Sequence, residues 1–177
     1  RYETRHGRAV LLCVPPDIDG DTFVSDALAR TPPPHVVRDP DPQWVTHSTD
    51  LDAWARIRED GALKSSALLT AEGATPDDLG FRVLGEPADY AEYVMLGSME
   101  RVGGEHVVAS RRAGRIITDE DAPHEPGVCL YFDNRELIRA GLGERDGAHL
   151  IEVRGHLPLE PYLVEAISAR DIESEAG

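Results

Sequence analysis

Cysteine, lysine and aromatic side chains are scarce in this sequence. Among 177 residues there are two cysteines, and aromatic residues make up 6% of the chain. A miniprotein stapled by disulfides is excluded, because 41% of the residues are hydrophobic and a chain of this length can bury a core without staples. Cys13 and Cys129 both lie in apolar runs, so we expect two buried free thiols rather than a redox or metal-binding pair.

Long apolar runs are also missing. The longest one, at residues 9–14, is far shorter than the roughly 20 residues that cross a bilayer. Nothing resembles a secretory signal peptide. We therefore expect a soluble, cytoplasmic protein without a membrane partner.

Positive charge is the third shortage. The chain has 18 Lys and Arg against 33 Asp and Glu, a net charge of -15 and a pI near 4.7. This balance opposes binding to long polyanions, because neutralised phosphates supply most nonspecific affinity for nucleic acid. A local basic patch could still bind a short nucleic-acid element.

One basic patch stands out, at Arg111, Arg112 and Arg115. Guanidinium groups bind phosphate with two parallel hydrogen bonds, so the patch is a candidate site for a pyrophosphate or a substrate. The alternative is that these arginines pair with the acidic residues of the loop at 118–125. No GxGxxG, P-loop, HExxH or paired CxxC motif occurs, so we expect neither a common nucleotide-binding loop nor a metal site.

Hydrophobic periodicity predicts an α+β fold with helices mainly in the N-terminal half. We expect one compact domain at residues 43–177, preceded by a strand-helix extension at residues 1–42. The predicted helices are residues 22–30 capped by Asp21, a helix opened by a Thr49/Asp52 capping box and ended by Gly61, residues 87–96, and a short helix capped by Asp133 with Glu136. The predicted strands are residues 9–14, 44–47, 107–109, 128–132, 149–153 and 162–167. A second capping box, Thr75 with Asp78, opens a short turn.

Three segments carry groups suited to chemistry. His47, Ser48 and Thr49 stand where a strand runs into a helix N-terminus, which offers free N–H groups to an anion. Tyr131 lies on a strand immediately before another capped helix, and a late strand carries two glutamates, Glu160 and Glu165. Each segment also has a purely structural interpretation: a cap with a partly buried histidine, an aromatic core residue, and exposed strand carboxylates.

Taken together, these segments resemble the ADP-ribosyltransferase superfamily. The matching stretches are HST after an apolar strand, LDAWARIREDGAL, GVCLYFDNREL and YLVEAISARDI. The chain looks most like the branch that contains RNA 2'-phosphotransferases and DarT-type DNA ADP-ribosyltransferases, whose members have a His-x-Thr strand and a helix ending in Glu-x-Gly-Leu. The segment 59–63 matches the latter with one residue inserted, and the resemblance covers about residues 43–172.

The resemblance implies a split, mostly antiparallel β fold with NAD in a cleft between two small sheets. It also implies a His, Tyr and Glu triad. His47 would hold the adenosine ribose, Tyr131 would face the nicotinamide, and the family's glutamate falls on Glu160 with Glu165 as the rival. Pro161 after Glu160 departs from the family pattern. Ser48 and Thr49 belong to the matched HST motif, and Arg111, Arg112 and Arg115 join the candidate NAD-binding residues because guanidinium groups suit a pyrophosphate.

The implied activity is transfer of ADP-ribose from NAD to an acceptor, which is glycosyltransferase chemistry that needs no metal. The acceptor is open: a protein, a small molecule or a short nucleic-acid element. The alternatives are an RNA 2'-phosphotransferase, an NAD glycohydrolase and a non-catalytic module that keeps the NAD cleft. Glu105 and Val108 depart from the RHVHLS motif of the phosphotransferases, which weighs against the first alternative.

Overall fold

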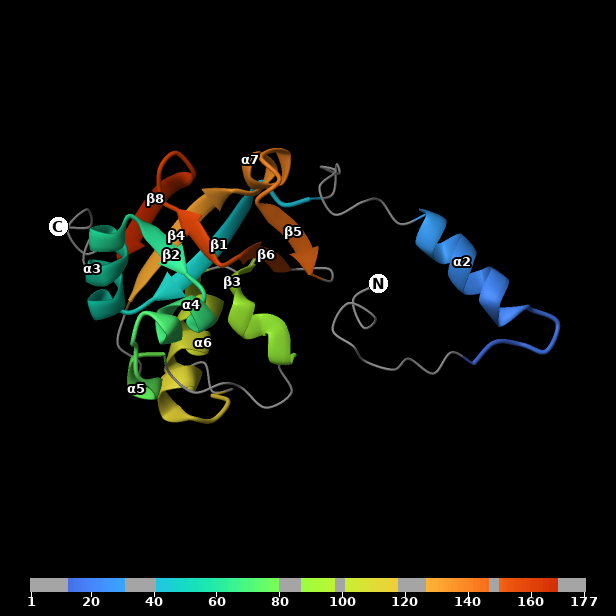
Figure 1. The fold of residues 1–177 in the computed structure, drawn as a ribbon, viewed down its shortest axis with the longest axis horizontal. Coiled ribbons are helices and arrows are strands. Elements are labelled where there is room, and N and C mark those ends of the chain that lie inside the picture. Colours follow the sequence, from blue (N-terminus) through green and yellow to red (C-terminus); the bar gives the residue numbers. More distant parts are fainter. Residues whose placement is uncertain are drawn as a thin grey trace.

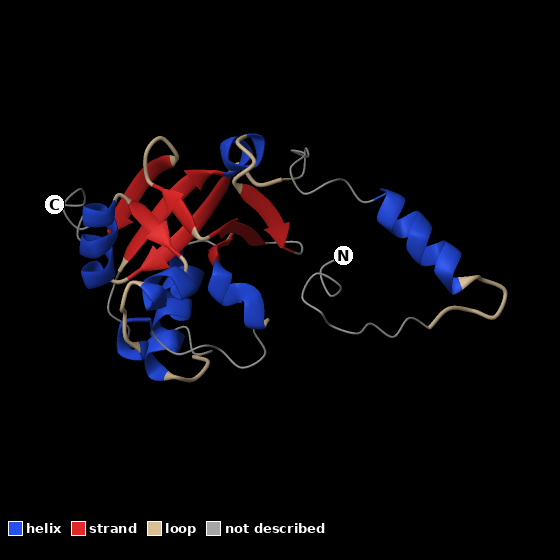
Figure 2. Cartoon of the chain, in the orientation of Figure 1, coloured by secondary structure: helices blue, strands red, loops and turns tan. Residues whose placement is uncertain are grey.

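Two antiparallel sheets form the centre of the structure (Figure 2). The structure is a computed structural model that describes residues 13–30, 41–79, 87–97, 101–117, 127–146 and 150–168. The strands are β1 (Trp44–Thr49), β2 (Ala62–Lys64), β3 (Tyr93–Gly97), β4 (Val128–Asp133), β5 (Gly143–Asp146), β6 (Leu150–Arg154), β7 (His156–Pro158) and β8 (Leu163–Ser168). The six-stranded sheet has the order β5-β6-β3-β1-β4-β8, and β2 pairs with β7 in the small sheet.

The helices lie mostly in the first two thirds of the chain, so the predicted α+β class is confirmed. They are α2 (Gly20–Arg30), α3 (Leu51–Asp60), α4 (Ser66–Ala71), α5 (Pro76–Leu79), the 3-10 helix η1 (Ala88–Glu92), α6 (Arg101–Ala113) and α7 (Asn134–Arg139). Figure 1 shows α2 apart from the sheets, whereas α3 and α6 lie against the body. Among the described helices, none is long and apolar enough to cross a membrane.

The main core covers one face of the large sheet. Side chains alternate between the two faces along a strand, so Val45, Leu130 and Phe132, all 0% exposed, share the core face through the β1–β4 register. Leu157 of the small sheet and Leu137 of α7 belong to the same cluster. β1 is therefore held in the middle of the sheet, with a buried layer on one side.

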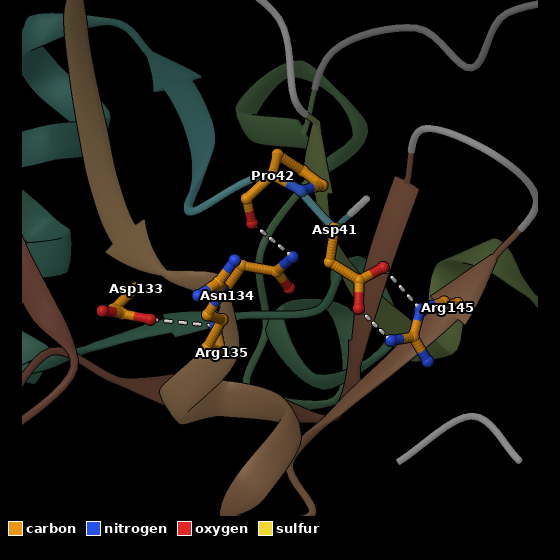
Figure 3. A network of polar contacts seen from close by, with 6 residues as sticks. All are labelled: Asp41, Pro42, Asp133, Asn134, Arg135 and Arg145. Atoms are coloured by element: carbon orange, nitrogen blue, oxygen red, sulfur yellow. Dashed lines mark hydrogen bonds and ion pairs between the residues drawn. The ribbon is translucent and has the colours of Figure 1, made fainter. Parts of the chain in front are cut away.

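Polar contacts fix the point where the chain enters β1 (Figure 3). Asp41 forms a two-bond ion pair with Arg145 of β5, in which Nε donates to Oδ1 over 3.0 Å. Asn134 donates from its side chain to the Pro42 carbonyl and from its backbone to the Gln43 carbonyl, both over 2.9 Å. These bonds tie the start of β1 to α7 and β5, and so set the position of the strand that carries His47.

Two of the predicted helix caps agree with the structure and two do not. Gly61 ends α3 with φ 66°, and Asp133 caps α7 by accepting from Arg135 N and Glu136 N, so both predictions are confirmed. The predicted Thr49 cap is wrong: Asp50 caps α3, because Thr49 is still paired with Val128 in the sheet. The predicted Asp21 cap is also wrong, since Asp19 accepts from the Thr22 N–H at the start of α2.

One predicted helix is half a strand, and one predicted strand is part of a helix. Residues 87–96 form η1 and then β3, because the strand-favouring run Tyr93–Gly97 pairs with β6. Residues 107–109 belong to α6, where flanking helix formers outweigh two adjacent valines.

Cys129 is buried, but Cys13 is exposed, contrary to expectation. Of the predicted strand 9–14, residues 9–12 lie outside the described residues, and residues 13 and 14 form no strand.

Candidate functional site

Three neighbouring strands carry two of the predicted triad residues and the rival glutamate, whereas the favoured Glu160 lies outside them. His47 lies on β1, Tyr131 on β4 and Glu165 on β8, and β4 stands between the other two. These strands come from distant parts of the sequence. The sheet order therefore brings the candidate residues together.

The strand register aligns a polar row across β1, β4 and β8. Tyr131 lies opposite Thr46 on one side and opposite Glu165 on the other. Directly opposed residues of antiparallel strands project to the same face, with Cβ atoms about 5 Å apart. Thr46 is 8% exposed, Tyr131 is partly buried and Glu165 is exposed, so the row runs from the interior to the surface.

A bulge in β8 sets the position of Glu165. Phe132 pairs with Leu163, but the next residue back, Tyr131, pairs with Glu165, so Val164 has no partner in this register. Val164 is 54% exposed. Such bulges re-aim the side chains beside them, and here the bulge places a carboxylate rather than a valine next to Tyr131.

Ser48 adds a hydroxyl group to the face of this row. It lies two residues after Thr46 on β1 and opposite Cys129 on β4, so its side chain projects to the same face as Tyr131. Its Oγ is buried and has no hydrogen-bond partner among the described residues, whereas Thr46 Oγ1 donates to the Gly97 carbonyl over 3.2 Å. A buried hydroxyl without a partner is unfavourable, and a ligand group would relieve it.

His47 projects from the opposite face. Its partner on β4 is Leu130, and its Nδ1 lies 3.2 Å from the Met95 carbonyl oxygen. Burial lowers the pKa of His47; the hydrogen bond to Met95 opposes this shift, and the nearby Arg111 guanidinium adds to it. The net effect favours a neutral imidazole whose Nδ1–H donates to the carbonyl and whose Nε2 is an acceptor. The structure thus brings Tyr131 and Glu165 together and aims the His47 side chain away from them.

The helix N-terminus after β1 is filled by a side chain of the protein itself. Asp50 accepts from Ala53 N over 2.8 Å, and Arg112 Nη2 lies 3.1 Å from Asp50 Oδ2. Partial burial raises the pKa of Asp50, but the bond from Ala53 and the charge of Arg112 outweigh it, so the pKa is lowered overall. An anionic ligand here would have to displace the Asp50 carboxylate. The cap at Asp50 was not predicted from the sequence.

The arginine patch lies beside β1. α6 packs against β1, with Arg111 close enough to lower the pKa of His47 and Arg112 paired with Asp50. Arg115 is exposed beyond the end of α6. The alternative partner of these arginines, the acidic segment 118–125, lies outside the described residues. A signal for the Asp50–Arg112 pair is absent from the sequence, because 61 residues separate the two.

Glu160 stands in the turn between β7 and β8. It is exposed, and the turn is closed by Tyr162 N, which donates to the Leu159 carbonyl over 2.8 Å. The register gives Glu160 no partner on β4, in contrast to Glu165. Within the described part of the chain, no group of three His, Cys, Asp or Glu side chains could hold a metal ion.

Comparison with known proteins adds no family assignment: no protein-family model matches the chain, and no curated protein matches it. A function must therefore rest on the residues of β1, β4 and β8 and on the elements packed against them.

Proposed function

We propose that the protein is an NAD-dependent ADP-ribosyltransferase. The observation that carries this proposal is that Tyr131 on β4 lies opposite Glu165 on β8. β4 is also the neighbour of β1, the strand that bears His47. An aromatic ring and a carboxylate on one face are the two groups that nicotinamide release needs most. The motif resemblance in the sequence supports the same reaction.

The chemistry explains this need. The bond from the ribose C1′ to the nicotinamide nitrogen breaks, and nicotinamide leaves as a neutral molecule while positive charge develops on the ribose. A fixed carboxylate stabilises that charge electrostatically. A flat aromatic side chain contacts nicotinamide at little entropic cost. The acceptor then bonds to C1′ through its nucleophilic atom and gives up its proton.

The remaining polar groups fit an NAD molecule. The buried Ser48 hydroxyl lacks a partner on the Tyr131 face and can bond to an amide or ribose group. Arg111 and Arg112 supply positive charge at the end of β1 for the pyrophosphate, and Arg112 would exchange Asp50 for a phosphate oxygen. The resemblance gives the adenosine ribose to His47, but the side chains of His47 and Thr49 project from the face opposite to Tyr131, so neither shares the surface proposed for the nicotinamide.

Two carboxylates compete for the catalytic role. The family spacing favours Glu160, whereas the cross-strand position beside Tyr131 favours Glu165. Both are exposed, so neither is needed to fill the core. Replacing each by Gln keeps the shape of the side chain and removes only the charge.

The acceptor is a protein, a small molecule or a short nucleic-acid element, since a net charge of -15 opposes long polyanions. The second candidate function is RNA 2'-phosphotransfer, which the Arg patch favours and Glu105 and Val108 disfavour. NAD hydrolysis and ligand binding without turnover are the remaining alternatives.

The test uses NAD labelled in the adenosine half, with and without cell extract. We expect nicotinamide release and label on a component of the extract, while a short RNA with an internal 2'-phosphate stays unchanged. Loss of that phosphate would instead establish the phosphotransferase. Binding of NAD without release would establish the non-catalytic module, and neither binding nor release would refute the proposal.

A further inference from the structure

Opposite charges gather on two helical segments of this chain. Residues 13–30 carry four Asp and one Arg, whereas residues 101–117 carry four Arg and one Glu. The second segment is a strong exception in a chain whose net charge is -15. The two segments are therefore electrostatically complementary.

The acidic segment also exposes apolar side chains. Phe23 is 44% and Val24 43% exposed on α2, and Ile18 just before the helix is 39% exposed. The exposed carboxylates of Asp17 and Asp26 flank them. Figure 1 shows α2 apart from the sheets. A helix of 11 residues is marginal by itself in water and gains most of its stability from packing, so packing on another surface would stabilise α2.

The basic segment exposes apolar side chains of its own. Val107 on α6 is 41% exposed, and Ile116 just after the helix is 63% exposed. Arg111 follows Val107 by four residues and so lies on the same side of the helix. Arg115, also exposed, stands beside Ile116. The surface thus combines apolar contact area with positive charge, the counterpart of α2.

We propose that α2 of one molecule packs against α6 of a second copy of this chain. Apolar residues would meet at the centre, and the Asp residues of α2 would face Arg111 and Arg115 at the rim. Figure 1 shows α2 apart from the sheets, and the exposed side chains of Phe23 and Val24 are accessible to another molecule. A twofold arrangement forms the contact twice, which doubles the buried area for one association event. Single helix faces are smaller than standard interfaces of about 1,600 Å², so the dimer is weak and salt-sensitive.

Sedimentation equilibrium of the full chain tests this proposal, from micromolar to millimolar protein at about 0.05 M and about 0.5 M salt. We expect a monomer–dimer equilibrium whose dissociation constant rises at least several-fold at the higher salt. A monomer at every concentration overturns the proposal, including the case in which α2 folds back on its own α6.

Substitutions locate the contact. Phe23→Ser with Val24→Ser should weaken the dimer at least tenfold, whereas Val164→Ser, at an exposed valine on β8, should not. Asp17→Arg with Asp26→Arg, or Arg111→Glu with Arg115→Glu, should each weaken it, and combining all four should restore it. Thermal unfolding of each variant checks that the sheets remain folded. A dimer that survives the α2 substitutions, or a charge swap that fails to restore it, contradicts the proposed contact.

Discussion

Tyr131 on β4 lies directly opposite Glu165 on β8, and the bulge at Val164 is what puts it there. Without the bulge, alternation along β8 would place Val164 beside Tyr131 and turn the glutamate to the other face. Bulges are frequent next to active sites. This one joins an aromatic ring and a carboxylate on a surface that also holds the buried hydroxyl of Ser48.

Ser48→Ala separates a ligand-binding serine from a structural one. Because Ser48 Oγ is buried and has no partner among the described residues, its removal should leave the free energy of unfolding unchanged or raise it slightly. Loss of one hydrogen bond to the ligand should weaken NAD affinity about 2- to 10-fold. Urea denaturation and calorimetry with NAD measure the two effects.

Thr46→Val is the matched control for Ser48→Ala. It removes the bond from Thr46 Oγ1 to the Gly97 carbonyl, so it should lower stability by about 1 kcal/mol. A Ser48→Ala protein that loses stability and binds NAD normally would show that the hydroxyl is structural.

Gly127→Ala should destabilise the β1–β4 pair. A Cβ at this position would come within 2.1 Å of the Thr49 carbonyl oxygen, which is backbone and cannot rotate away. We expect a loss of at least about 1–3 kcal/mol, as for other overpacked sites. Gly20→Ala is the control, since its Cβ would have only a 3.7 Å contact with Val14. Equal unfolding midpoints in urea for the two variants would show that β1 and β4 do not approach as described.

The Asp41–Arg145 pair should show strong coupling. The two side chains are 6% and 10% exposed, so replacing one alone leaves a buried charge and should cost about 3–5 kcal/mol. The double variant Asp41→Leu/Arg145→Met should be clearly more stable than the sum of the single losses implies. Urea denaturation of the four proteins gives the coupling free energy, and additive losses would mean that the pair is open in solution.

Stability should fall in mild acid because of His47. Its pKa is lowered in the folded protein from 6.5, so below pH 6.5 the unfolded chain binds the proton more readily and unfolding is favoured. This loss grows until the pH reaches the folded pKa. Urea denaturation between pH 7.5 and pH 5 should show a smaller decline for His47→Gln than for the wild type. His156→Gln, at an exposed histidine on β7, should decline like the wild type, and an unchanged decline for His47→Gln would contradict a partly buried, neutral imidazole.

The sequence predicted those elements whose signals are local. Asp133 and Gly61 act at the ends of the helices they adjoin, and the late strands have strongly apolar centres. The short strands β2, β5 and β7 were not predicted, because three or four residues are too few to show an alternating hydrophobic pattern. They exist through pairing with distant partners, such as Leu63 with Leu157.

The candidate site was predictable only in part for the same reason. The residue types could be chosen from motifs, but the face on which each side chain lies depends on register. Thr46 and His47 are adjacent in the sequence, but only the Thr46 side chain projects to the face of Tyr131. The ion pair of Asp50 with Arg112 likewise depends on how α6 packs against β1.

Nicotinamide release from NAD is the measurement that decides the proposed reaction, made on the wild type, Glu160→Gln and Glu165→Gln. Glu59→Gln, at an exposed residue of α3, is the matched control. We expect the wild type and the control to release nicotinamide at the same rate. One of the two test variants should be slower by about a hundredfold to a thousandfold, with little change in NAD affinity, because the charge acts mainly on the transition state. Loss in Glu165→Gln would assign the role to the cross-strand neighbour of Tyr131, and loss in Glu160→Gln to the family spacing. Full release by both variants, or no release by the wild type, would contradict ADP-ribosyl transfer at this site.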